Sequence, residues 1–357
     1  MEIFWYIALL FMLTVYLVLE GYDFGAGIVH LLFAKSEEDK KMITKSIGPF
    51  WDANEVWLIA SGGVLFFAFP TLYASSFSGF YLPLIMILWL LIFRAIGLEL
   101  YGFVNNHLWK SIWNTSFGVA SLLLALFFGI ALGNIVRGVN LGMVENGVST
   151  QEAHYFFLPL WNSTFSPQAN HLGVIDWFTV FLGVIAVIAL TIHGANWVIY
   201  KTSSSLNQKL KKVVFIMNFA LLAFVIVSLL VWHYIQENPY ENFNNHPWLW
   251  IFPVISFAGI FGLFKVKSYK DGMGFLFSTL FLVGGFVASA VSIFPKMLPS
   301  TNEVNPSLTL YNASAHEYGL SIGVFWFVIA FALVSLYFIV QHKVFKGKMD
   351  HIHYGDH

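Results

Sequence analysis

Cysteine is absent from this chain of 357 residues, and only 10% of the residues are charged. The missing thiols exclude disulfides, thiolate ligation of haem and cysteine-held iron–sulfur clusters within the chain. A net charge of −1 offers no basic surface to neutralise phosphates, so no nucleic-acid partner is expected. Soluble domains carry about 25% charged residues. The scarcity of charge, with 58% hydrophobic residues and a mean hydropathy of +0.72, predicts a polytopic membrane protein.

Nine apolar runs are long enough to cross a bilayer as helices, which need about 20 residues each. Helices are expected because the strands of a membrane barrel alternate polar and apolar residues, and these runs do not. The start of the chain lacks the basic residues of a cleaved signal, so the first run is expected to be retained. The predicted spans are residues 3–33, 50–69, 77–94, 117–135, 177–200, 213–232, 248–264, 275–294 and 320–340.

Lysine and arginine predict the orientation, because they concentrate in the cytoplasmic loops of membrane proteins. With nine spans and the N-terminus outside, 16 of the 18 basic residues fall in inner segments. Arg137 and Lys296 are the two that fall outside. The sequence therefore predicts an outer N-terminus and an inner C-terminus.

The whole chain, residues 1–357, is expected to form one all-α integral membrane domain. Spans one to four (1–135) and five to eight (177–294) are interpreted as two four-helix bundles. Residues 136–176 read as a packed outer loop, since nothing outside the spans is long enough to fold independently. The ninth helix is expected at the periphery, within a segment (295–357) that includes a flanking loop and a cytoplasmic tail.

Ionisable residues near the inner end of the first span form the first candidate site. Glu20, Asp23 and His30 are spaced three and seven apart, so they share one helical face. Gly21 and Gly25 form a pair of small residues that allows close helix approach. Charges at membrane depth are costly and usually functional, and this stripe suits proton transfer. The alternative is a buried polar seam that only locks helix packing.

The start of the second span carries Asp52 and Glu55, flanked by Trp51 and Trp57. The two acids lie in the first turn after Pro49, a residue favoured at helix starts. They are candidates for proton uptake from the inner face. The alternative is that they only complement the positive end of the helix dipole.

Arg94, one of only two arginines, ends an apolar run. Glu99 follows at a spacing of five, which is poor geometry for a pair within one helix. Arg94 is therefore expected to reach across to Asp23, Asp52 or Glu55. The alternative is a side chain that extends to the inner interface.

Two histidines are candidates for haem ligation, which requires ligands at equal depth on facing helices. His30 and His193 both lie toward the inner ends of their spans. A single histidine within the membrane is more often a hydrogen-bonded polar group than a ligand, so no metal site is predicted. His351, His353 and His357 are expected in a solvated tail.

Several motifs together resemble subunit II of cytochrome bd-type quinol oxidases. Residues 21–27 are similar to a G-[FY]-D-x-G-x-G signature, and residues 51–57 to a W-D-x-N-x-V-W motif. Residues 93–99 resemble an F-R-x-x-G-x-[DE] motif, and residues 129–134 and 299–309 also fit. The resemblance runs nearly end to end.

The resemblance implies a heterodimer with a haem-carrying subunit I, which holds haem b, haem d and the quinol oxidation site. It implies no haem and no catalytic residue in this chain, but a cytoplasmic proton route and, in some members, an oxygen route and a bound structural quinone. By motif, Asp52 resembles the proton-uptake acid, and Trp57 the tryptophan beside the oxygen route. Glu20 and Glu99 stand where aspartate is common, which conserves charge. The proton-pathway candidates are Asp52, Asp23, Glu20, Glu55, Arg94, Glu99 and His30.

The sequence thus favours the haem-free subunit of an oxidase in a bacterial cytoplasmic membrane, which takes electrons from quinol, reduces oxygen to water and generates a proton gradient. Two other classes stay open. A stand-alone proton-coupled transporter would need broken helices near the midplane, whereas the charges here cluster toward one surface. A self-contained membrane cytochrome b would need a haem in the chain itself.

Overall fold

The computed structural model describes residues 1–142, 144–145, 148–149, 158–169, 172–203, 205–236, 238–268 and 270–349. His351, His353 and His357 of the expected tail lie outside these residues. The helices are α1 (Glu2–Leu32), α2 (Glu37–Ile47), α3 (Trp51–Ala68), α4 (Pro70–Gly79), α5 (Tyr81–Leu100), α6 (His107–Arg137), α7 (Trp177–Lys201), α8 (Leu206–Ile235), α9 (Glu241–Asn245), η1 (Pro247–Trp250), α10 (Ile251–Leu263), α11 (Asp271–Ile293) and α12 (Glu317–Val344). The short strands β1 (Val144–Glu145) and β2 (Val148–Ser149) pair antiparallel, as do β3 (Lys296–Leu298) and β4 (Leu308–Thr309).

Seven of the nine predicted spans each fall on one helix, whereas residues 77–94 run from α4 into α5 and residues 248–264 from η1 into α10. Seven of the helices in the described residues, α1, α5, α6, α7, α8, α11 and α12, are long and apolar enough to cross a membrane. α3 has 18 residues and starts with polar ones, and α10 has 13 residues after the short helix η1. The structure confirms a polytopic all-α membrane protein, whereas nine crossings and the orientation stay predictions.

Two helix boundaries have local causes. The fourth span was predicted to begin at residue 117, but α6 already begins at His107. Asn106 caps it there by accepting hydrogen bonds from the backbone N–H groups of Leu108 and Trp109. The second span gives way to a separate helix, α4, at Pro70, because proline has no N–H to continue the hydrogen-bonding pattern of α3.

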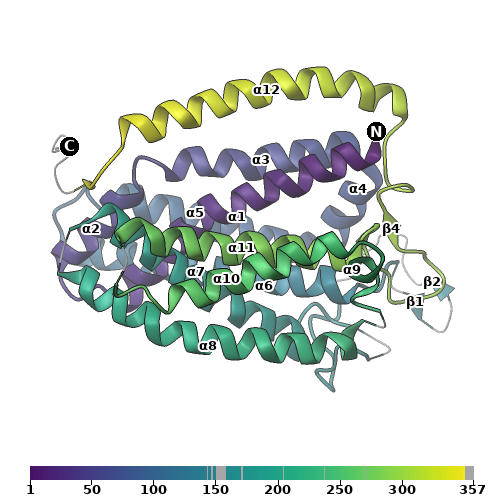
Figure 1. Cartoon of the computed structure of the whole chain (residues 1–357), viewed down its shortest axis with the longest axis horizontal. Helices are drawn as coiled ribbons and strands as arrows, with labels where there is room; N and C mark the ends of the chain where they lie inside the picture. Colours follow the sequence, from purple (N-terminus) through teal and green to yellow (C-terminus); the bar gives the residue numbers. More distant parts are fainter. Residues whose placement is uncertain are drawn as a thin grey trace.

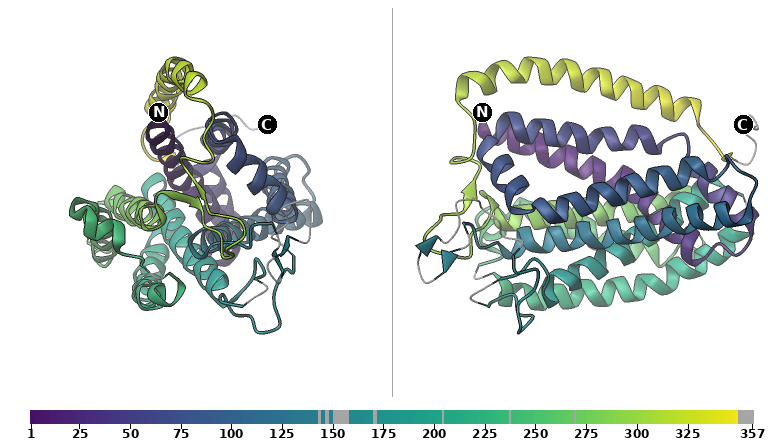
Figure 2. Two further views of the ribbon diagram at one scale, coloured as in Figure 1. Left: turned by 90° about the vertical axis from the view of Figure 1, so that its right-hand side faces the viewer. Right: turned by 180° about the vertical axis from the view of Figure 1, so that it is seen from behind.

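Helices α1, α6 and α7 form the centre of the molecule (Figures 1 and 2). α1 packs against α3, α6 and α7, while α5 packs against α6. On the other side α7 packs against α8 and α11, and α10 against α11. The helices of the two proposed four-helix bundles therefore meet through these three central helices.

Helix α12 lies along the outside of the bundle (Figure 1). Of its residues, all of which are described, only Leu320 and Gln341 are buried. Trp5 Nε1 donates a hydrogen bond to the Leu320 carbonyl at 3.1 Å. Near the other end, Gln341 Nε2 donates to the Pro49 carbonyl at 2.7 Å. Polar contacts near its two ends thus fasten α12 to the bundle.

The two ends of the bundle carry different segments (Figure 2). The N-terminus, α9 and the strands lie at one end, and α2 and the last residues of α12 lie at the other. At the first end the chain after α6 is held by the segment before α12. The Val139 N–H donates to the Pro299 carbonyl, and the Thr301 N–H donates to the Val139 carbonyl, both at 3.0 Å. In the predicted orientation the α2 end faces the cytoplasm.

α1 and α7 cross with their backbones in contact. A Cβ atom added to Gly25 would overlap the Leu190 carbonyl and the Gly194 backbone, and one added to Gly194 would overlap the backbone at Gly25 and Ala26. Small residues are what allow membrane helices to approach this closely. This crossing places the polar face of α1 next to the centre of the bundle.

We expect Gly25→Ala and Gly194→Ala each to destabilise the protein by roughly 1–3 kcal/mol, because neither backbone can move away from the added methyl group. The thermal unfolding midpoint of the detergent-purified protein measures this. Gly62→Ala is the matched control, since a Cβ there meets nothing within 4 Å. Equal midpoints for all three variants would contradict the close crossing.

Candidate functional site

A buried ion cluster joins three helices. Arg94 of α5 is fully buried, and its Nη2 atom lies 2.5 Å from Oε1 of Glu20 on α1 and 2.6 Å from Oε1 of Glu55 on α3. The rings of Phe24 and Trp51 flank the guanidinium, with centroids 5.1 Å and 5.8 Å from Cζ. The pairing across helices expected of Arg94 is therefore present, shielded by aromatic side chains.

Asp23 extends this cluster toward the first turn of α3. Asn54 Nδ2 donates hydrogen bonds to Asp23 Oδ2 and to the Tyr22 hydroxyl oxygen, both at 2.7 Å. All three side chains are buried, and the Tyr22 ring stacks on Trp197 of α7 with centroids 3.9 Å apart. Asn54 thereby fixes the start of α3 beside α1.

The cluster holds more acids than cations. Glu20, Asp23 and Glu55 surround the single guanidinium of Arg94, with which all three interact electrostatically. Among the described residues, Arg94 Nε and Nη1, Asp23 Oδ1 and the Tyr16 hydroxyl have no hydrogen-bond partner. Buried polar groups normally have partners, and surplus buried charge is expensive. The arrangement therefore has the capacity to hold protons and to bind water.

The remaining proton-pathway candidates lie around this cluster. Asp52 is exposed at the start of α3, one turn before Glu55, and Glu99 is exposed near the end of α5. Neither forms an ion pair within the described part of the chain. Asp52 is thus not a partner of Arg94, because its side chain points away from the interior. The pair with Glu20, in contrast, was not anticipated from the sequence.

His30 is buried at the end of α1, apart from the Arg94 cluster. Its exposed fraction is 2%, and its ring lies edge-on to Phe117 of α6 at 5.3 Å between centroids. Glu20 and Asp23 are buried as well, but so is every other residue of α1 from Glu20 to His30. Burial therefore does not single out the stripe predicted from the spacing, which stays a prediction.

Trp57 borders a cavity of about 610 Å³ between α1, α3 and α12. Its side chain is buried and contacts Phe338 of α12, with ring centroids 5.5 Å apart. The other lining side chains include Met12, Val64 and Val334, so the space is apolar. A nonpolar molecule could enter this space without displacing a hydrogen bond.

A second apolar cavity, of about 530 Å³, lies among α1, α6, α7, α8, α10 and α11. Leu182, Phe128, Leu282 and other apolar side chains line it, and Glu20 is the one acid among its lining residues. Glu20 thus faces both Arg94 and an apolar space.

His193 serves a different purpose from His30. Its Nδ1 atom lies 2.8 Å from the Ser278 hydroxyl of α11, and its Nε2 atom lies 2.9 Å from the Val18 carbonyl of α1. Because a carbonyl only accepts, Nε2 carries a proton and donates it. Both nitrogens are occupied in tying α7 to its neighbours.

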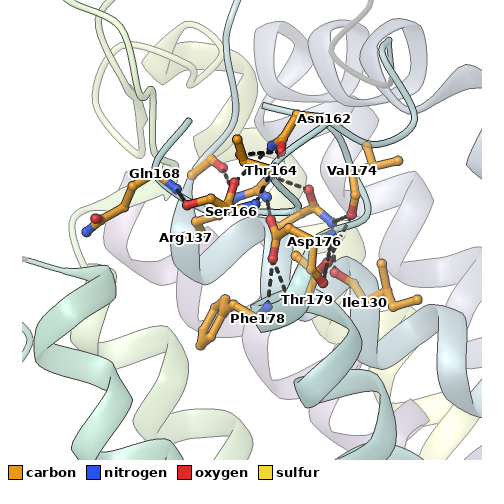
Figure 3. Close-up of polar contacts among 12 residues, drawn as sticks. Ile130, Arg137, Asn162, Thr164, Ser166, Gln168, Val174, Asp176, Phe178 and Thr179 are labelled. Carbon is orange, nitrogen blue, oxygen red and sulfur yellow. Dashed lines mark hydrogen bonds and ion pairs between the residues drawn. The ribbon is translucent and has the colours of Figure 1, made fainter. Parts of the chain in front are cut away.

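A second buried ion pair, which the sequence does not predict, lies at the other end of the bundle (Figure 3). Arg137 at the end of α6 binds Asp176 through Nη1 and donates from Nη2 to Asn134 Oδ1 at 2.7 Å. Asp176 also caps α7 by accepting from the N–H groups of Phe178 and Thr179. The only signal in the sequence was an aspartate directly before an apolar run, which is typical of an N-cap.

The fold and these clusters define a polytopic helical membrane protein with a buried, acid-rich ion cluster beside apolar cavities. Comparison with known families identifies it further. The family described as cytochrome bd terminal oxidase subunit II matches residues 1–345, and the chain belongs to this family. It is therefore a subunit of a quinol oxidase, an oxidoreductase complex, which confirms the predicted family and leaves the stand-alone transporter without support.

The relatives of this chain are similar to it over nearly its whole length. A probable cytochrome oxidase subunit 2 of Haemophilus influenzae is 28% identical, over 97% of this chain and 94% of the relative. Subunit 2 of the cytochrome bd-I ubiquinol oxidase of Escherichia coli K12 is 26% identical, over 93% and 91%. The structure of the bd oxidase from Geobacillus thermodenitrificans matches with a TM-score of 0.62 and 12% identity, over 96% of this chain and 97% of the other. At that identity the structural match concerns the fold alone.

We expect Arg94→Leu to destabilise the protein by about 3–5 kcal/mol, because it leaves the buried Glu20 carboxylate without its cation. The double variant Arg94→Leu with Glu20→Leu should recover much of this loss, since an apolar pair can replace a buried ion pair. Thermal unfolding of the purified protein measures both, with Lys296→Gln on the surface as control. A double variant no more stable than Arg94→Leu alone would contradict this account.

Proposed function

We propose that this chain is the haem-free subunit of a bacterial cytochrome bd-type oxidase in the cytoplasmic membrane, paired with a subunit I that carries haem b, haem d and the quinol oxidation site. The complex oxidises quinol, reduces oxygen to water and generates a proton gradient. Family membership supports the reaction class. The two occupied nitrogens of His193 support placing the haems in the partner, because a haem ligand needs a free ring nitrogen.

The observation that carries our proposal is the acid cluster around Arg94. Exposure falls from Asp52, which is exposed, through Glu55, whose side chain is 20% exposed, to Glu20, which is fully buried. Asp52 and Glu55 are one helical turn apart, and Glu55 and Glu20 share the same guanidinium nitrogen. This series leads from the surface into the bundle. Protons drawn along it from the cytoplasm to oxygen would separate charge across the membrane without a pump.

The two apolar cavities support further roles. The cavity beside Trp57 suits the passage of oxygen, which needs no polar lining. The cavity of about 530 Å³ beside Glu20 suits the isoprenoid chain of a structural quinone, the group that the family resemblance implies. Residues such as Leu182, Phe128 and Leu282 would hold that chain by apolar contact alone.

Asp52→Asn should slow oxygen reduction about tenfold with quinol as donor, roughly 1.4 kcal/mol in the barrier, because an amide cannot take up a proton. Glu20→Gln should slow it as well. Turnover of the assembled oxidase measures this, with the haem spectrum of the partner as the check on assembly. Native turnover in both variants, with normal assembly, would refute the proton route.

Trp57→Ala should change the apparent oxygen affinity of the complex, because it widens the cavity between α3 and α12, whereas the bulk-preserving Trp57→Phe should change it less. Oxygen-uptake rates at limiting oxygen make the comparison. If neither variant alters the apparent affinity, Trp57 only packs against α12.

A further inference from the structure

A second polar cluster lies at the α2 end of the bundle, where α1 and α5 end. The Glu37 carboxylate of α2 accepts hydrogen bonds from Lys40 Nζ at 2.8 Å and from the Tyr101 hydroxyl at 2.7 Å. Its side chain is 60% exposed. Tyr101 directly follows α5, so this contact connects the surface helix α2 to the end of a membrane-spanning helix.

The cluster continues inward to His30. Asn114 of α6 is near enough to interact with both Tyr101 and His30, without a hydrogen bond of ordinary geometry to either within the described part of the chain. Asn114 is 7% exposed and His30 is 2% exposed, so burial increases step by step from Glu37. Among the described residues neither ring nitrogen of His30 has a well-formed hydrogen bond. A buried imidazole whose two nitrogens both lack a hydrogen-bond partner is unusual and calls for an explanation.

Beyond His30 the contact between α1 and α6 leads to the Arg94 cluster. His30 and Asp23 lie seven residues apart on α1, about 10 Å along the helix axis, which is too far for direct transfer. Between them Gly27 leaves room for the fully buried Ser121 of α6, whose hydroxyl oxygen a Cβ at Gly27 would overlap. This hydroxyl donates a hydrogen bond to the Phe117 carbonyl at 2.7 Å. Asp23 Oδ1 at the far end has no partner among the described residues. A hydroxyl at Gly27 therefore lies between the helix positions of two buried titratable groups.

The charged groups that face His30 are Lys40 and Glu37 of α2, beside the neutral Asn114 of α6, which also lies near Tyr101. The Lys40 and Tyr101 hydrogen bonds keep the pKa of Glu37 below its usual range. Burial, together with the bond to Glu37, raises the pKa of Tyr101 to about 12. At neutral pH the surface therefore presents an ionised carboxylate, joined to a hydroxyl that keeps its proton.

We propose that Glu37, Tyr101, Asn114 and His30 form a second line of proton uptake. This line does not include Asp52, and it supplies protons to the Arg94 cluster along the contact between α1 and α6. In this line a water molecule bound at Asn114 carries the proton from the Tyr101 hydroxyl to one ring nitrogen of His30. His30 releases a proton from its other nitrogen through the Ser121 hydroxyl to Asp23, so the charges of Tyr101, His30 and Ser121 return to their starting values. Asn114 orients the water and carries no proton itself. This proposal rests on the proton route proposed above.

The test compares variants of the assembled oxidase in two backgrounds, native and Asp52→Asn. In the native background we expect Tyr101→Phe and His30→Gln to lower turnover by about twofold, because Asp52 still supplies protons. In the Asp52→Asn background each should remove most of the remaining turnover, by about a further tenfold. Tyr311→Phe, an exposed tyrosine at the opposite end of the bundle, is the matched control. Proton uptake into proteoliposomes is followed with a pH-sensitive dye beside turnover.

Three outcomes would overturn the proposal. Asp52→Asn without residual turnover would show that no parallel line exists. If Tyr101→Phe and His30→Gln leave proton uptake unchanged in the Asp52→Asn background, these residues do not form a parallel line. A lower unfolding temperature with unchanged turnover and pH profile would assign the cluster to anchoring α2. If His30→Gln does not assemble, Tyr101→Phe decides, since it removes one hydroxyl from a partly exposed ring. Native turnover in Asp52→Asn and Glu20→Gln themselves would instead refute the route proposed above.

Discussion

The guanidinium of Arg94 is the interaction on which the arrangement of α1, α3 and α5 depends. Its two carboxylate partners, Glu20 and Glu55, belong to different helices, and α3 and α5 make little other contact. Removing such ions from water costs several kcal/mol each, which is offset only when all partners are in place. One cation therefore fixes the positions of three helices along their axes relative to one another. The hydrogen bonds of Asn54 to α1 then follow from that register.

The helical period explains how much of the site could be predicted. The spacing of Glu20, Asp23 and His30 predicts that they share one face, and all three are buried, as is every residue of α1 between them. The acid that pairs with Arg94 could not be predicted, because it depends on the relative sliding of two helices, which no repeat within one helix encodes. The crossing at Gly25 shows the same limit, since the sequence indicates a small residue but not which helix it meets.

Arg137 illustrates how burial changes the meaning of a charge. From the sequence it is one of two exceptions to the concentration of basic residues on one side. In the structure it is 8% exposed and bound to Asp176, so its charge is compensated within the protein. The orientation rule counts lysine and arginine rather than net charge, so Arg137 still counts as an exception. The outer N-terminus therefore stays a prediction.

Protons and small nonpolar molecules need opposite surroundings, and this bundle separates them. Titratable side chains follow the contacts of α1 with α3 and α6, whereas the two cavities have apolar linings. Glu20 lies at the boundary, because it faces the apolar cavity on one side and Arg94 on the other. An apolar space offers no donor or acceptor to pass a proton on. In the proposed route, a proton reaches Glu20 from the side of Glu55 and Asp23, and the apolar side keeps it from escaping into the cavity.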